Sequence, residues 1–508
     1  MAVSFVPASD HDPHVEARRA QRPLVLAIDI GSTSVRTCVF DARGRALHGC
    51  AAERRHDFAT DSHGASVIDA DLVVDGCAAA IGETLLALGR TAVDAVAADS
   101  FASSFICVDA AGDALTPCLT YADSRSWAQL DELRARVDED EIHQLTGARL
   151  HTSYHAPKFA WLREESPGLL DKTAAVESIG TYVVRRLTGR RIESISSAAW
   201  SGLLDRRGAG YCDAVLGLVD ARPDWFAPLA DPTQRVAAAP GSAASRWPQA
   251  ASAQWFAPVP DGLASNWGVG AIGPSALALS AATSGAMRVL VPSSDGPIPR
   301  GLWSYRVSHG DALVGGALND VGRVLTWWGA LAVPLDTEDR RRVWSAPPVD
   351  GAPVFLPFLT GERSTGWAGR ARAGLSSVTA ATGPREAWRA VGEGLALSYL
   401  RIHRQLVEAG ARPDIVLASG GVVRHYPEIL PLVADCLGVD LAPVVGERIT
   451  MRGAALMAVR ALLGGEADYR VPVGEAVRTR GELRGAYDSR LEAFEEAYRA
   501  AIGALPGS

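Results

Sequence analysis

The chain has 508 residues, 48% of them hydrophobic, and a formal net charge of −8. This length predicts more than one domain, each with a substantial buried core. Only two of its 50 basic residues are lysines, Lys158 in YHAPKFAWL and Lys172 in LLDKTAA. Neither context fits a P-loop or a protein kinase, which need a lysine after a glycine-rich turn or in a particular strand. The composition therefore excludes both classes.

The charge pattern and the cysteines restrict partners and compartment. There is no basic block, so a nucleic acid is not an expected partner, and no apolar run reaches the roughly 18 residues of a membrane helix. Residues 1–22 mix acids, His, Pro and Arg and are expected to form a disordered tail rather than a signal peptide. The seven cysteines are scattered without a C-x-x-C pair, which is typical of a reduced cytoplasmic protein without a zinc site.

Strands and helices alternate in the first half. Residues 24–30 (LVLAIDI) and the following VRTCVFD predict two antiparallel strands around a tight Gly/Ser/Thr turn. A helix is expected near 71–90 and a strand at 95–99. Residues 130–205 are predicted to be mainly helical, and residues 205–260 are predicted to be irregular. The alternation predicts an α/β fold.

A second series of strands begins at 276–282 and continues through MRVLVP, SYRVS and DALVGGA. Apolar residues spaced by three or four predict a long helix in REAWRAVGEGLALSYLRIHRQLVEAG, with Pro384 in its first turn and Gly410 at its end. Residues 414–419 predict a strand that leads through two glycines to another helix. Since IDIGSTSVRTCVF and AATSGAMRVLV share a hydroxyl-rich turn, an arginine and a strand, we expect two similar lobes that meet at a cleft, with a boundary near 272.

Three hydroxyl- or glycine-rich turns are candidate phosphate sites. In residues 29–36 (DIGSTSVR) a carboxylate at a strand end precedes a turn of N–H groups and hydroxyls, which suits magnesium and phosphate oxygens. Residues 282–285 (ATSG) and 419–421 (SGG) also follow strands, and paired glycines let a flat or phosphorylated ligand approach the backbone. Ordinary turns are the alternative for all three segments.

Asp261, in PDGLASNWG, is the candidate general base. A carboxylate with an ordinary pKa of about 3.9 is ionised at neutral pH and can accept a proton from a substrate hydroxyl. A simple Asp-Gly turn is the alternative.

Taken in order, these segments resemble the FGGY family of carbohydrate kinases, over about residues 24–465. The matching segments are AIDIGSTSVR, DGLASNWGVGAIGP, TSGAMR and ASGGVVRHYPEILPLVADCLG. The resemblance implies a two-lobed, actin-like and hexokinase-like α/β ATPase fold made of duplicated ribonuclease-H-like domains. Residues 23–271 would form the domain that binds the sugar and carries the base, and 272–508 the domain that binds the nucleotide.

The resemblance also implies a reaction and a role for each matching residue. Asp261 would deprotonate the sugar hydroxyl and Asp29 would help hold Mg2+. Residues expected around ATP are Ser32, Thr33, Ser34, Arg36, Thr283, Ser284, Gly285, Gly322, Gly420, Gly421 and His425; those expected at the sugar are Asp123, Arg125, Tyr154 and Asp261. Phosphoryl transfer mainly requires alignment of the reacting groups and neutralisation of charge, which this set supplies.

Further stretches look most like the gluconate kinases of this family, and much of the pattern is shared with xylulose kinases. They are LVGGALNDVGRVLTWW, LPFLTGERSTGWAGRARAGLSS, TYADSRSW, TGARLHTSYHAPKFAWLREESP and SSAAWSGLLD. The expected reaction is ATP-dependent phosphorylation of gluconate to 6-phosphogluconate, with xylulose or another pentulose or polyol as the alternative acceptor.

Several residues depart from the family pattern. Val422, Val423 and His425 stand where small or polar residues are expected, which affects the adenine contacts, and Glu193 stands where Asp is usual. The segment 265–267 (SNW) after the base is also unusual and affects sugar specificity. Lys158 either binds a substrate carboxylate or has a structural role, and the structural role is favoured.

Two other classes of function remain as alternatives. One is a non-catalytic, actin-like nucleotide-binding regulator or assembly protein, which the presence of both Asp29 and Asp261 argues against. The other is an acid–base enzyme that uses the cleft without ATP. The expected partner is a small sugar or sugar acid; a homodimer is compatible with the sequence, in which nothing sets the oligomeric state.

Overall fold

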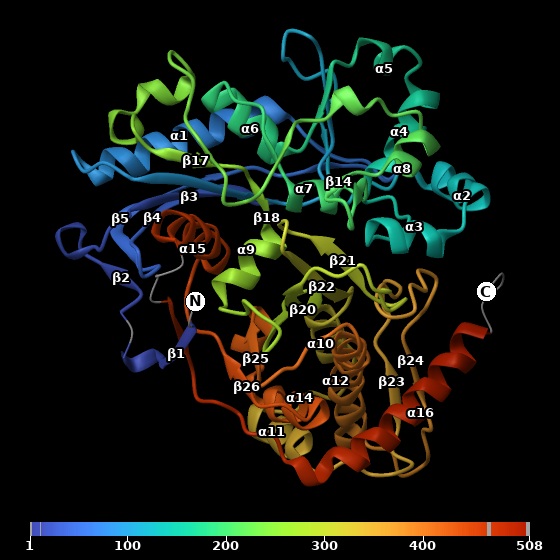
Figure 1. Ribbon diagram of the computed structural model, residues 1–508. Coiled ribbons are helices and arrows are strands. Elements are labelled where there is room, and N and C mark those ends of the chain that lie inside the picture. The colour runs from blue at the N-terminus through green and yellow to red at the C-terminus, as the bar shows by residue number, and fades with distance from the viewer. Residues whose placement is uncertain (1–2, 11, 465–468, 504–508) are drawn as a thin grey trace.

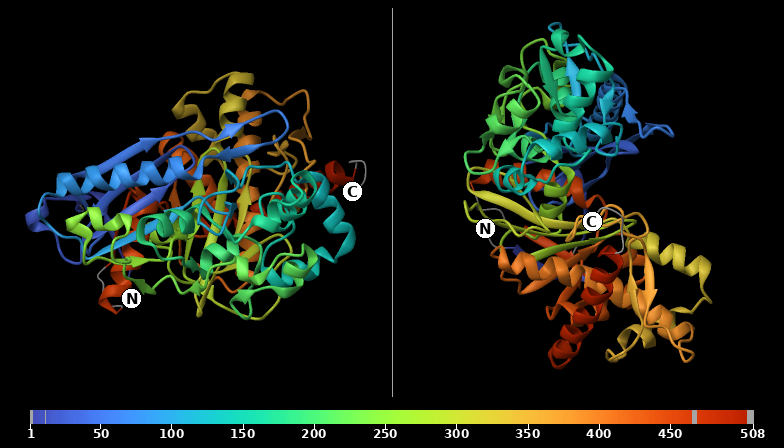
Figure 2. Two further views of the ribbon diagram at one scale, coloured as in Figure 1. Left: turned by 90° about the horizontal axis from the view of Figure 1, so that it is seen from above. Right: turned by 90° about the vertical axis from the view of Figure 1, so that its right-hand side faces the viewer.

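The chain folds into two α/β lobes, each built on its own sheet (Figure 1). This computed structural model describes residues 3–10, 12–464 and 469–503. Figure 1 places one lobe above the other, with the helices α9 (Asp261–Gly268) and α15 (Ile449–Leu463) between them, and the side view of Figure 2 shows the same separation. The predicted two-lobed α/β architecture is confirmed.

The sheet of the first lobe brings three parallel strands side by side. Its order is β16-β17-β8-β3-β4-β5-β2, and β18 also pairs with β8. The bounds are β2 (His14–Val15), β3 (Val25–Ile30), β4 (Ser34–Phe40), β5 (Ala46–Arg55), β8 (Ala95–Ser100), β16 (Arg235–Val236), β17 (Gln254–Phe256) and β18 (Val259–Pro260). As predicted, β3 and β4 are antiparallel. Because β3, β8 and β18 run parallel, their carboxyl ends meet at one edge of the sheet.

The helices of this lobe form most of the segment predicted to be helical, and the first and sixth of them pack against the main sheet. The helices are α1 (Ala70–Leu88), α2 (Trp127–Arg136), α3 (Glu139–Thr146), α4 (His155–Glu165), α5 (Leu169–Lys172), α6 (Ile179–Thr188), α7 (Ile195–Trp200) and α8 (Asp213–Leu218). Smaller strands accompany them: β6 (Ala59–Thr60), β7 (Ser66–Ile68), β9 (Ile106–Val108), β10 (Cys118–Leu119), β11 (Ala175–Glu177), β12 (Glu193–Ser194), β13 (Leu204–Asp205), β14 (Gly210–Tyr211) and β15 (Leu229–Ala230). Residues 205–260, expected to be irregular, contribute β17 and β18 to the main sheet, since strands this short show no periodicity.

The second lobe repeats the first arrangement. Its sheet has the order β21-β22-β20-β19-β25-β26, in which β19 and β20 form a hairpin and β19 lies parallel to β25. The bounds are β19 (Ala276–Ala281), β20 (Gly285–Pro292), β21 (Trp303–Arg306), β22 (Asp311–Leu318), β25 (Ile415–Ser419) and β26 (Leu441–Pro443). In the first lobe the turn is closed by Gly31 N–H donating to the Ser34 carbonyl at 3.0 Å, and in the second by Ala282 N–H donating to the Ser284 carbonyl at 2.8 Å. The internal repeat in the sequence is therefore a structural duplication.

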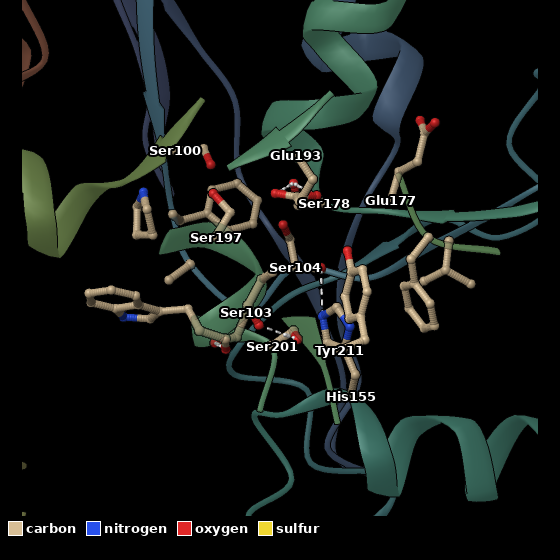
Figure 3. A pocket seen from close by; sticks show the side chains of 17 residues that line it. Ser100, Ser103, Ser104, His155, Glu177, Ser178, Glu193, Ser197, Ser201 and Tyr211 are labelled. Atoms are coloured by element: carbon tan, nitrogen blue, oxygen red, sulfur yellow. Dashed lines mark hydrogen bonds between the residues drawn. The ribbon is translucent and has the colours of Figure 1, made fainter. Parts of the chain in front are cut away.

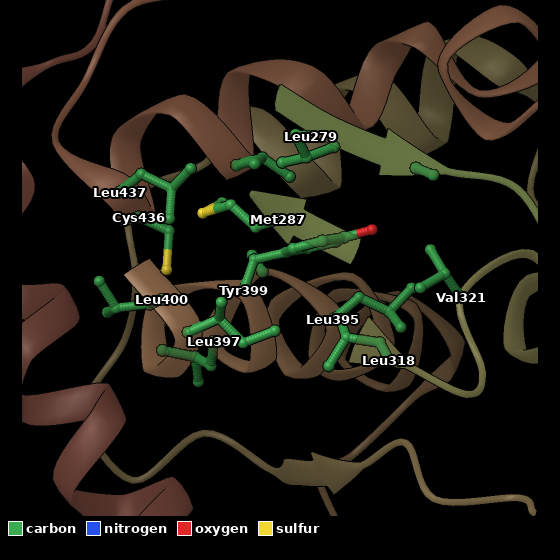
Figure 4. Packing of buried hydrophobic residues seen from close by; sticks show 14 of the residues in the cluster. Leu279, Met287, Leu318, Val321, Leu395, Leu397, Tyr399, Leu400, Cys436 and Leu437 are labelled. Carbon is green, nitrogen blue, oxygen red and sulfur yellow. The ribbon is translucent and has the colours of Figure 1, made fainter. Parts of the chain in front are cut away.

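The core of the second lobe lies between its sheet and the predicted long helix, α12 (Pro384–Glu408). Figure 4 shows Leu279 and Met287 of the sheet packed over Leu395 and Tyr399 of α12. The Tyr399 hydroxyl donates to the carbonyl of Ser280 at 2.8 Å, which ties the helix to the end of β19. Apolar burial of this kind contributes about 1.5–3 kcal/mol per large side chain.

The other elements of the second half surround this core. They are α10 (Gly322–Leu331), α11 (Thr337–Ser345), β23 (Val354–Leu356), β24 (Gly374–Ser376), α13 (Gly421–His425), α14 (Leu430–Leu437), β27 (Tyr469–Val473) and α16 (Arg484–Gly503). Among the described residues, no helix is long and apolar enough to cross a membrane. All seven cysteines are described, buried and free of disulfides.

Helix α15, from the end of the second half, packs against β3, β8 and α9 of the first lobe. The two helices touch through their backbones: a Cβ added at Gly453 would lie 1.7 Å from the Ala264 carbonyl oxygen, and one at Gly268 would lie 1.9 Å from that of Ile449. The first lobe is thus completed by residues far along the chain. The expected boundary near 272 lies between α9 and β19, and it stays a prediction.

The N-terminal segment differs from the expected disordered tail. β1 (Val3–Pro7) pairs in parallel with β27, and β2 pairs with β5. The expectation for residues 1–22 is therefore wrong for 3–10 and 12–22, while 1–2 and 11 lie outside the described residues. The composition of the whole segment hides the short apolar run VSFV, and its strand partner lies more than 450 residues away along the chain.

Candidate functional site

Three carboxylates gather where the parallel strands of the first lobe end. Asp29 of β3 and Asp99 of β8 are neighbours in register, and Asp261 directly follows β18. Burial raises the pKa of Asp29 to about 6. Burial, with the charges of Asp29 and Asp261 nearby, raises the pKa of Asp99 well above its ordinary value. Sequence analysis missed Asp99, although AADS ends a strand in the same way as AIDI.

This edge offers oxygen atoms to a cation. Both carboxylate oxygens of Asp99 are buried, Asp99 lies within hydrogen-bonding reach of Asp29, and Asp29 Oδ2 lies 3.9 Å from Arg36 Nη1. No group of three acidic, His or Cys side chains in the described part of the chain could hold a metal by itself. Mg2+ typically binds through one or two carboxylates together with substrate phosphates and waters. The donor set around Asp29 fits that mode of binding.

The hydroxyls of the first turn face different ways. Ser32 lines the cavity between the lobes, Thr33 is exposed, and the Ser34 hydroxyl is buried without a partner among the described residues. Arg36 Nε donates to Glu53 Oε1 at 3.2 Å. Of the four predicted phosphate contacts on this turn, one therefore faces the cavity and another, Arg36, lines a neighbouring space.

The central cavity lies between the lobes and has a volume of about 300 Å³, which is at the lower end of the range for small-molecule sites. Its walls include five of the predicted site residues from both halves: Ser32, Tyr154, Asp261, Ser284 and Gly285. They also include residues that sequence analysis did not single out, among them Trp200, Arg288, Trp303, Tyr305, Asn319 and Arg363. Arg288 lies in the segment TSGAMR and Arg363 in TGERSTGW. Both segments matched the family pattern, but neither arginine was predicted to be a site residue.

Asp261 is exposed to this cavity at the start of α9. The Gly262 N–H donates to Asp261 Oδ1 at 2.7 Å, which fixes the carboxylate. Burial among the cavity walls raises the pKa of Asp261, and the Arg288 guanidinium acts in the opposite direction. A carboxylate with a raised pKa is a stronger base, and it is still ionised at neutral pH when the rise is moderate.

Aromatic side chains form one wall of the central cavity. The rings of Trp200 and Tyr305 stack with centroids 4.0 Å apart, and those of Trp303 and Tyr305 stack at 4.6 Å. The Tyr154 hydroxyl hydrogen-bonds to that of Tyr305 at 2.5 Å, which joins the two lobes across the cavity. Sequence analysis identified Tyr154 alone of these four, because the others come from separate elements.

Two further spaces continue from the central cavity. A connecting cavity contains Arg36 and Gly420 and shares Ser280 with the central cavity. An outer cavity shares Arg424 with the connecting one and contains the predicted Thr283, Gly322, Gly421 and His425. Val422, Trp327 and Tyr426 add apolar and aromatic surface there. The three spaces are neighbours that share wall residues, and together they extend from Asp261 to His425.

Gly420 is required where the connecting cavity passes β25. Its φ is +112°, and a Cβ there would lie 2.3 Å from the Ala281 carbonyl oxygen. Only glycine accommodates both the conformation and the contact. The SGG segment thus brings the backbone of the second lobe directly against the hairpin that carries Thr283 and Ser284.

Asp123 and Arg125, expected at the sugar, do not line the central cavity. They pair with each other: Arg125 Nη2 donates to Asp123 Oδ2 at 2.6 Å, and the guanidinium stacks over Trp161 at 4.3 Å. Asp123 Oδ2 also accepts from the Ser66 N–H at 3.1 Å. Their ion pair therefore stabilises the loop that carries Tyr121, and Tyr121 is part of the cavity wall.

Lys158 is buried, and its ammonium group donates to three backbone carbonyls. The acceptors are Ser103 at 3.2 Å, Thr120 at 2.8 Å and Ser153 at 3.2 Å. An ammonium has three N–H donors, so none is left for a substrate carboxylate. Burial lowers the pKa of Lys158 to about 8. The favoured structural role is the one the contacts support.

A separate, small polar cavity contains Glu193 (Figure 3). Glu193 accepts hydrogen bonds from Ser178 at 3.0 Å and Thr181 at 2.8 Å, at the start of α6, and burial raises its pKa to about 7. In Figure 3, His155 points toward Ser104, whose carbonyl lies 3.0 Å from the ring Nε2. About 20 Å³ of space holds no more than a single water. The Asp-to-Glu departure therefore alters the packing of α6 rather than the central, connecting or outer cavity.

The chain is similar to known carbohydrate kinases along most of its length. A curated gluconokinase from Bacillus subtilis (strain 168) is 22% identical over 417 residues, which cover 79% of this chain and 80% of the relative. Solved structures of a gluconate kinase and a ligand-bound xylulose kinase, both from Lactobacillus acidophilus, each superpose with a TM-score of 0.86. They cover 95% of this chain and 98% and 99% of theirs, at 21% and 22% identity.

A Plasmodium falciparum glycerol kinase solved with ADP has a TM-score of 0.81 at 15% identity, covering 94% of this chain and 98% of that one. Models of the N-terminal and C-terminal domains of the FGGY family of carbohydrate kinases match residues 24–251 and 277–462. The predicted family is confirmed: this chain belongs to the FGGY carbohydrate kinases, phosphotransferases that use ATP and an alcohol group as acceptor.

Proposed function

We propose that this kinase phosphorylates gluconate and forms 6-phosphogluconate. The observation that supports it best is the central cavity, where Asp261 faces both hydroxyl-rich turns, represented by Ser32 and Ser284. A hydroxyl bound beside Asp261 would therefore lie next to the groups suited to hold a phosphoryl donor. The gluconokinase and gluconate kinase relatives support the choice of acceptor.

In the proposed mechanism Asp261 removes the proton from the acceptor hydroxyl as that oxygen attacks the terminal phosphorus of ATP; the bond from this phosphorus to the bridging oxygen of the β-phosphate breaks, and ADP leaves. Oδ1 is held by the Gly262 N–H, so the carboxylate keeps a fixed direction toward the bound hydroxyl. Arg288 lies near enough to Asp261 to favour its ionised form. The aromatic wall excludes water from the same space, which limits hydrolysis of ATP.

The three spaces position the nucleotide in this proposal. Ser32, Ser284 and the backbone N–H groups of the two turns would surround the phosphates, and Gly420 would let the backbone approach them. Thr283, Gly322, Gly421 and His425, with Trp327, would surround the nucleoside in the outer cavity. Thr33, Ser34 and Arg36 contribute from the first turn when the lobes close on the ligand. Asp123 and Arg125 do not contact the sugar in this proposal. They stabilise the loop that carries Tyr121, which lines the sugar cavity.

Asp29, together with Asp99, is the proposed magnesium site, because the two residues lie opposite each other in register near the ends of β3 and β8. Bound Mg2+ neutralises charge on the β- and γ-phosphates. The Arg36 guanidinium lies opposite Asp29 and adds a positive charge beside the two carboxylates.

Release of ADP from Mg-ATP tests the function, with gluconate, xylulose, ribulose and glycerol as acceptors. Gluconate is expected to give the highest kcat/KM. Preference for xylulose would replace gluconate with the alternative acceptor of the same family. Absence of ADP above background with every acceptor would contradict a sugar kinase, and filaments seen by light scattering with ATP alone would favour an assembly protein.

Asp261→Asn is expected to abolish turnover while nucleotide binding, measured by calorimetry, is retained. The matched control is Asp224→Asn, since Asp224 lies on the surface and pairs with Arg222. Full activity of Asp261→Asn would contradict its role as the base.

A homodimer and a cytoplasmic location also stay predictions. Size-exclusion chromatography with light scattering tests whether the protein is a homodimer.

A further inference from the structure

Two arginines face the central cavity without a protein acceptor. Arg288 comes from β20 and Arg363 from the loop between β23 and β24. Within the described ranges neither guanidinium donates a hydrogen bond or forms an ion pair, and the Nε of Arg363 is buried without a partner. A guanidinium carries five donors and no acceptor, so leaving them unpaired in a cavity is costly. Both groups therefore have donors free for the acceptor atoms of a ligand.

The two arginines have different neighbours in the cavity wall. A Cβ added at Gly262, next to Asp261, would lie 3.8 Å from Arg288 Nε, which places Arg288 beside the base. Arg363 instead lies near Tyr305 and His151. Burial lowers the pKa of His151 to about 3 and Arg363 adds to that effect, while Arg363 opposes the rise that burial causes at Tyr305. Arg288 thus lies beside the base, and Arg363 lines the same cavity.

The charge of the cavity favours an anion. Among its lining residues Asp261 carries the one carboxylate, and Arg288 and Arg363 carry two positive charges. Lys158 does not contribute, because its three donors are bound to carbonyls. A ligand with one negative group would balance the excess, whereas a neutral sugar would leave a desolvated cation unpaired.

We propose that Arg363 binds the carboxylate of an open-chain sugar acid and thereby places the hydroxyl at the opposite end of the chain against Asp261. The proposal rests on the proposed kinase function and deepens it, since it assigns both the acidic substrate class and the position of phosphorylation to one residue. Arg363 is a specificity-determining residue: the reaction requires Asp261, and the choice of acceptor requires Arg363.

The test compares gluconate with D-glucitol, which has the same carbon chain with a neutral CH2OH in place of the carboxylate. At saturating Mg-ATP we expect wild type to favour gluconate by at least about 100-fold in kcat/KM. Arg363→Gln should raise KM for gluconate about 10- to 100-fold, as expected for loss of a charge-assisted pair, with kcat changed less than about threefold. Arg363→Lys should recover part of the loss. Arg300→Gln, on an exposed arginine, is the control.

Binding measurements and product analysis test the role of Arg363 independently of whether the protein has kinase activity. Calorimetry without nucleotide should show gluconate binding to wild type and loss of it in Arg363→Gln, even if no acceptor yields ADP. Circular dichroism and unchanged ATP binding establish that the variant is folded. An unchanged gluconate-to-glucitol ratio in folded Arg363→Gln would overturn the proposal. So would a wild-type product that carries phosphate on the carbon next to the carboxylate, as read by NMR.

Discussion

Replacement of Lys158 by methionine tests whether one buried cation organises the substrate cavity. Methionine fills a similar volume and leaves the carbonyls of Ser103, Thr120 and Ser153 without their donor. Each orphaned acceptor costs about 1–3 kcal/mol. Removal of the buried charge returns roughly 3 kcal/mol, because its pKa shift from 10.5 to about 8 corresponds to about 1.4 kcal/mol per unit. Three acceptors therefore cost about 3–9 kcal/mol, and the net loss is about 0–6 kcal/mol, with a central value of about 3 kcal/mol.

Urea denaturation followed by tryptophan fluorescence measures this loss, and Lys172→Met is the matched control, since Lys172 is exposed and is the only other lysine. The control should change stability by less than about 0.5 kcal/mol. The folded state binds the Lys158 proton less tightly than the unfolded chain, so wild type should gain stability over the variant between pH 8 and 10.5. Equal denaturation midpoints for the two variants would refute the reasoning.

Three further predictions concern the helices between the lobes, the small polar cavity and the outer cavity. Gly453→Ala should destabilise the protein by about 1–3 kcal/mol because the new Cβ meets a carbonyl of α9, whereas Gly485→Ala, in open space on α16, should stabilise it slightly; thermal melts measure both. Glu193→Gln should gain roughly 3 kcal/mol over wild type as pH rises from 4.5 to above 7, since the unfolded chain releases this proton more readily, and a pH-independent difference would contradict this. Trp327→Ala should raise KM for ATP about tenfold with KM for gluconate unchanged, and a shift in the gluconate KM alone would remove Trp327 from the nucleotide site.

The elements carried by local signals were predictable from the sequence. The hairpins β3–β4 and β19–β20 follow from alternation around hydroxyl-rich turns, and α12 from its apolar spacing and Pro384. The family resemblance then supplied their arrangement in two lobes. Strands of two or three residues, such as β17 and β18, carry no periodicity, and their pairing with β8 depends on contacts distant in sequence. The same reason explains why the pairing of β1 with β27 was missed.

Site residues were predicted where one motif supplies several of them. They were missed where the residues come from separate elements that meet only in the folded protein. Asp261, Ser32 and Ser284 reach one cavity as expected. Asp123 and Arg125 stand in a suitable motif, but in the folded protein the two charges pair with each other, which the motif does not reveal. Trp200, Trp303 and Tyr305 are ordinary aromatic residues in the sequence, and they become a wall because α7 and β21 come from different lobes.

The position of α15 has a consequence for the order in which the protein is made. The apolar faces of β3, β8 and α9 are covered by residues 449–463, which leave the ribosome after almost all of the second lobe. A nascent chain that ends near residue 271 would expose that surface, and compact intermediates with uncovered apolar faces aggregate readily. The two lobes therefore cannot mature one after the other during synthesis, and the first lobe acquires its final stability only when translation is nearly complete.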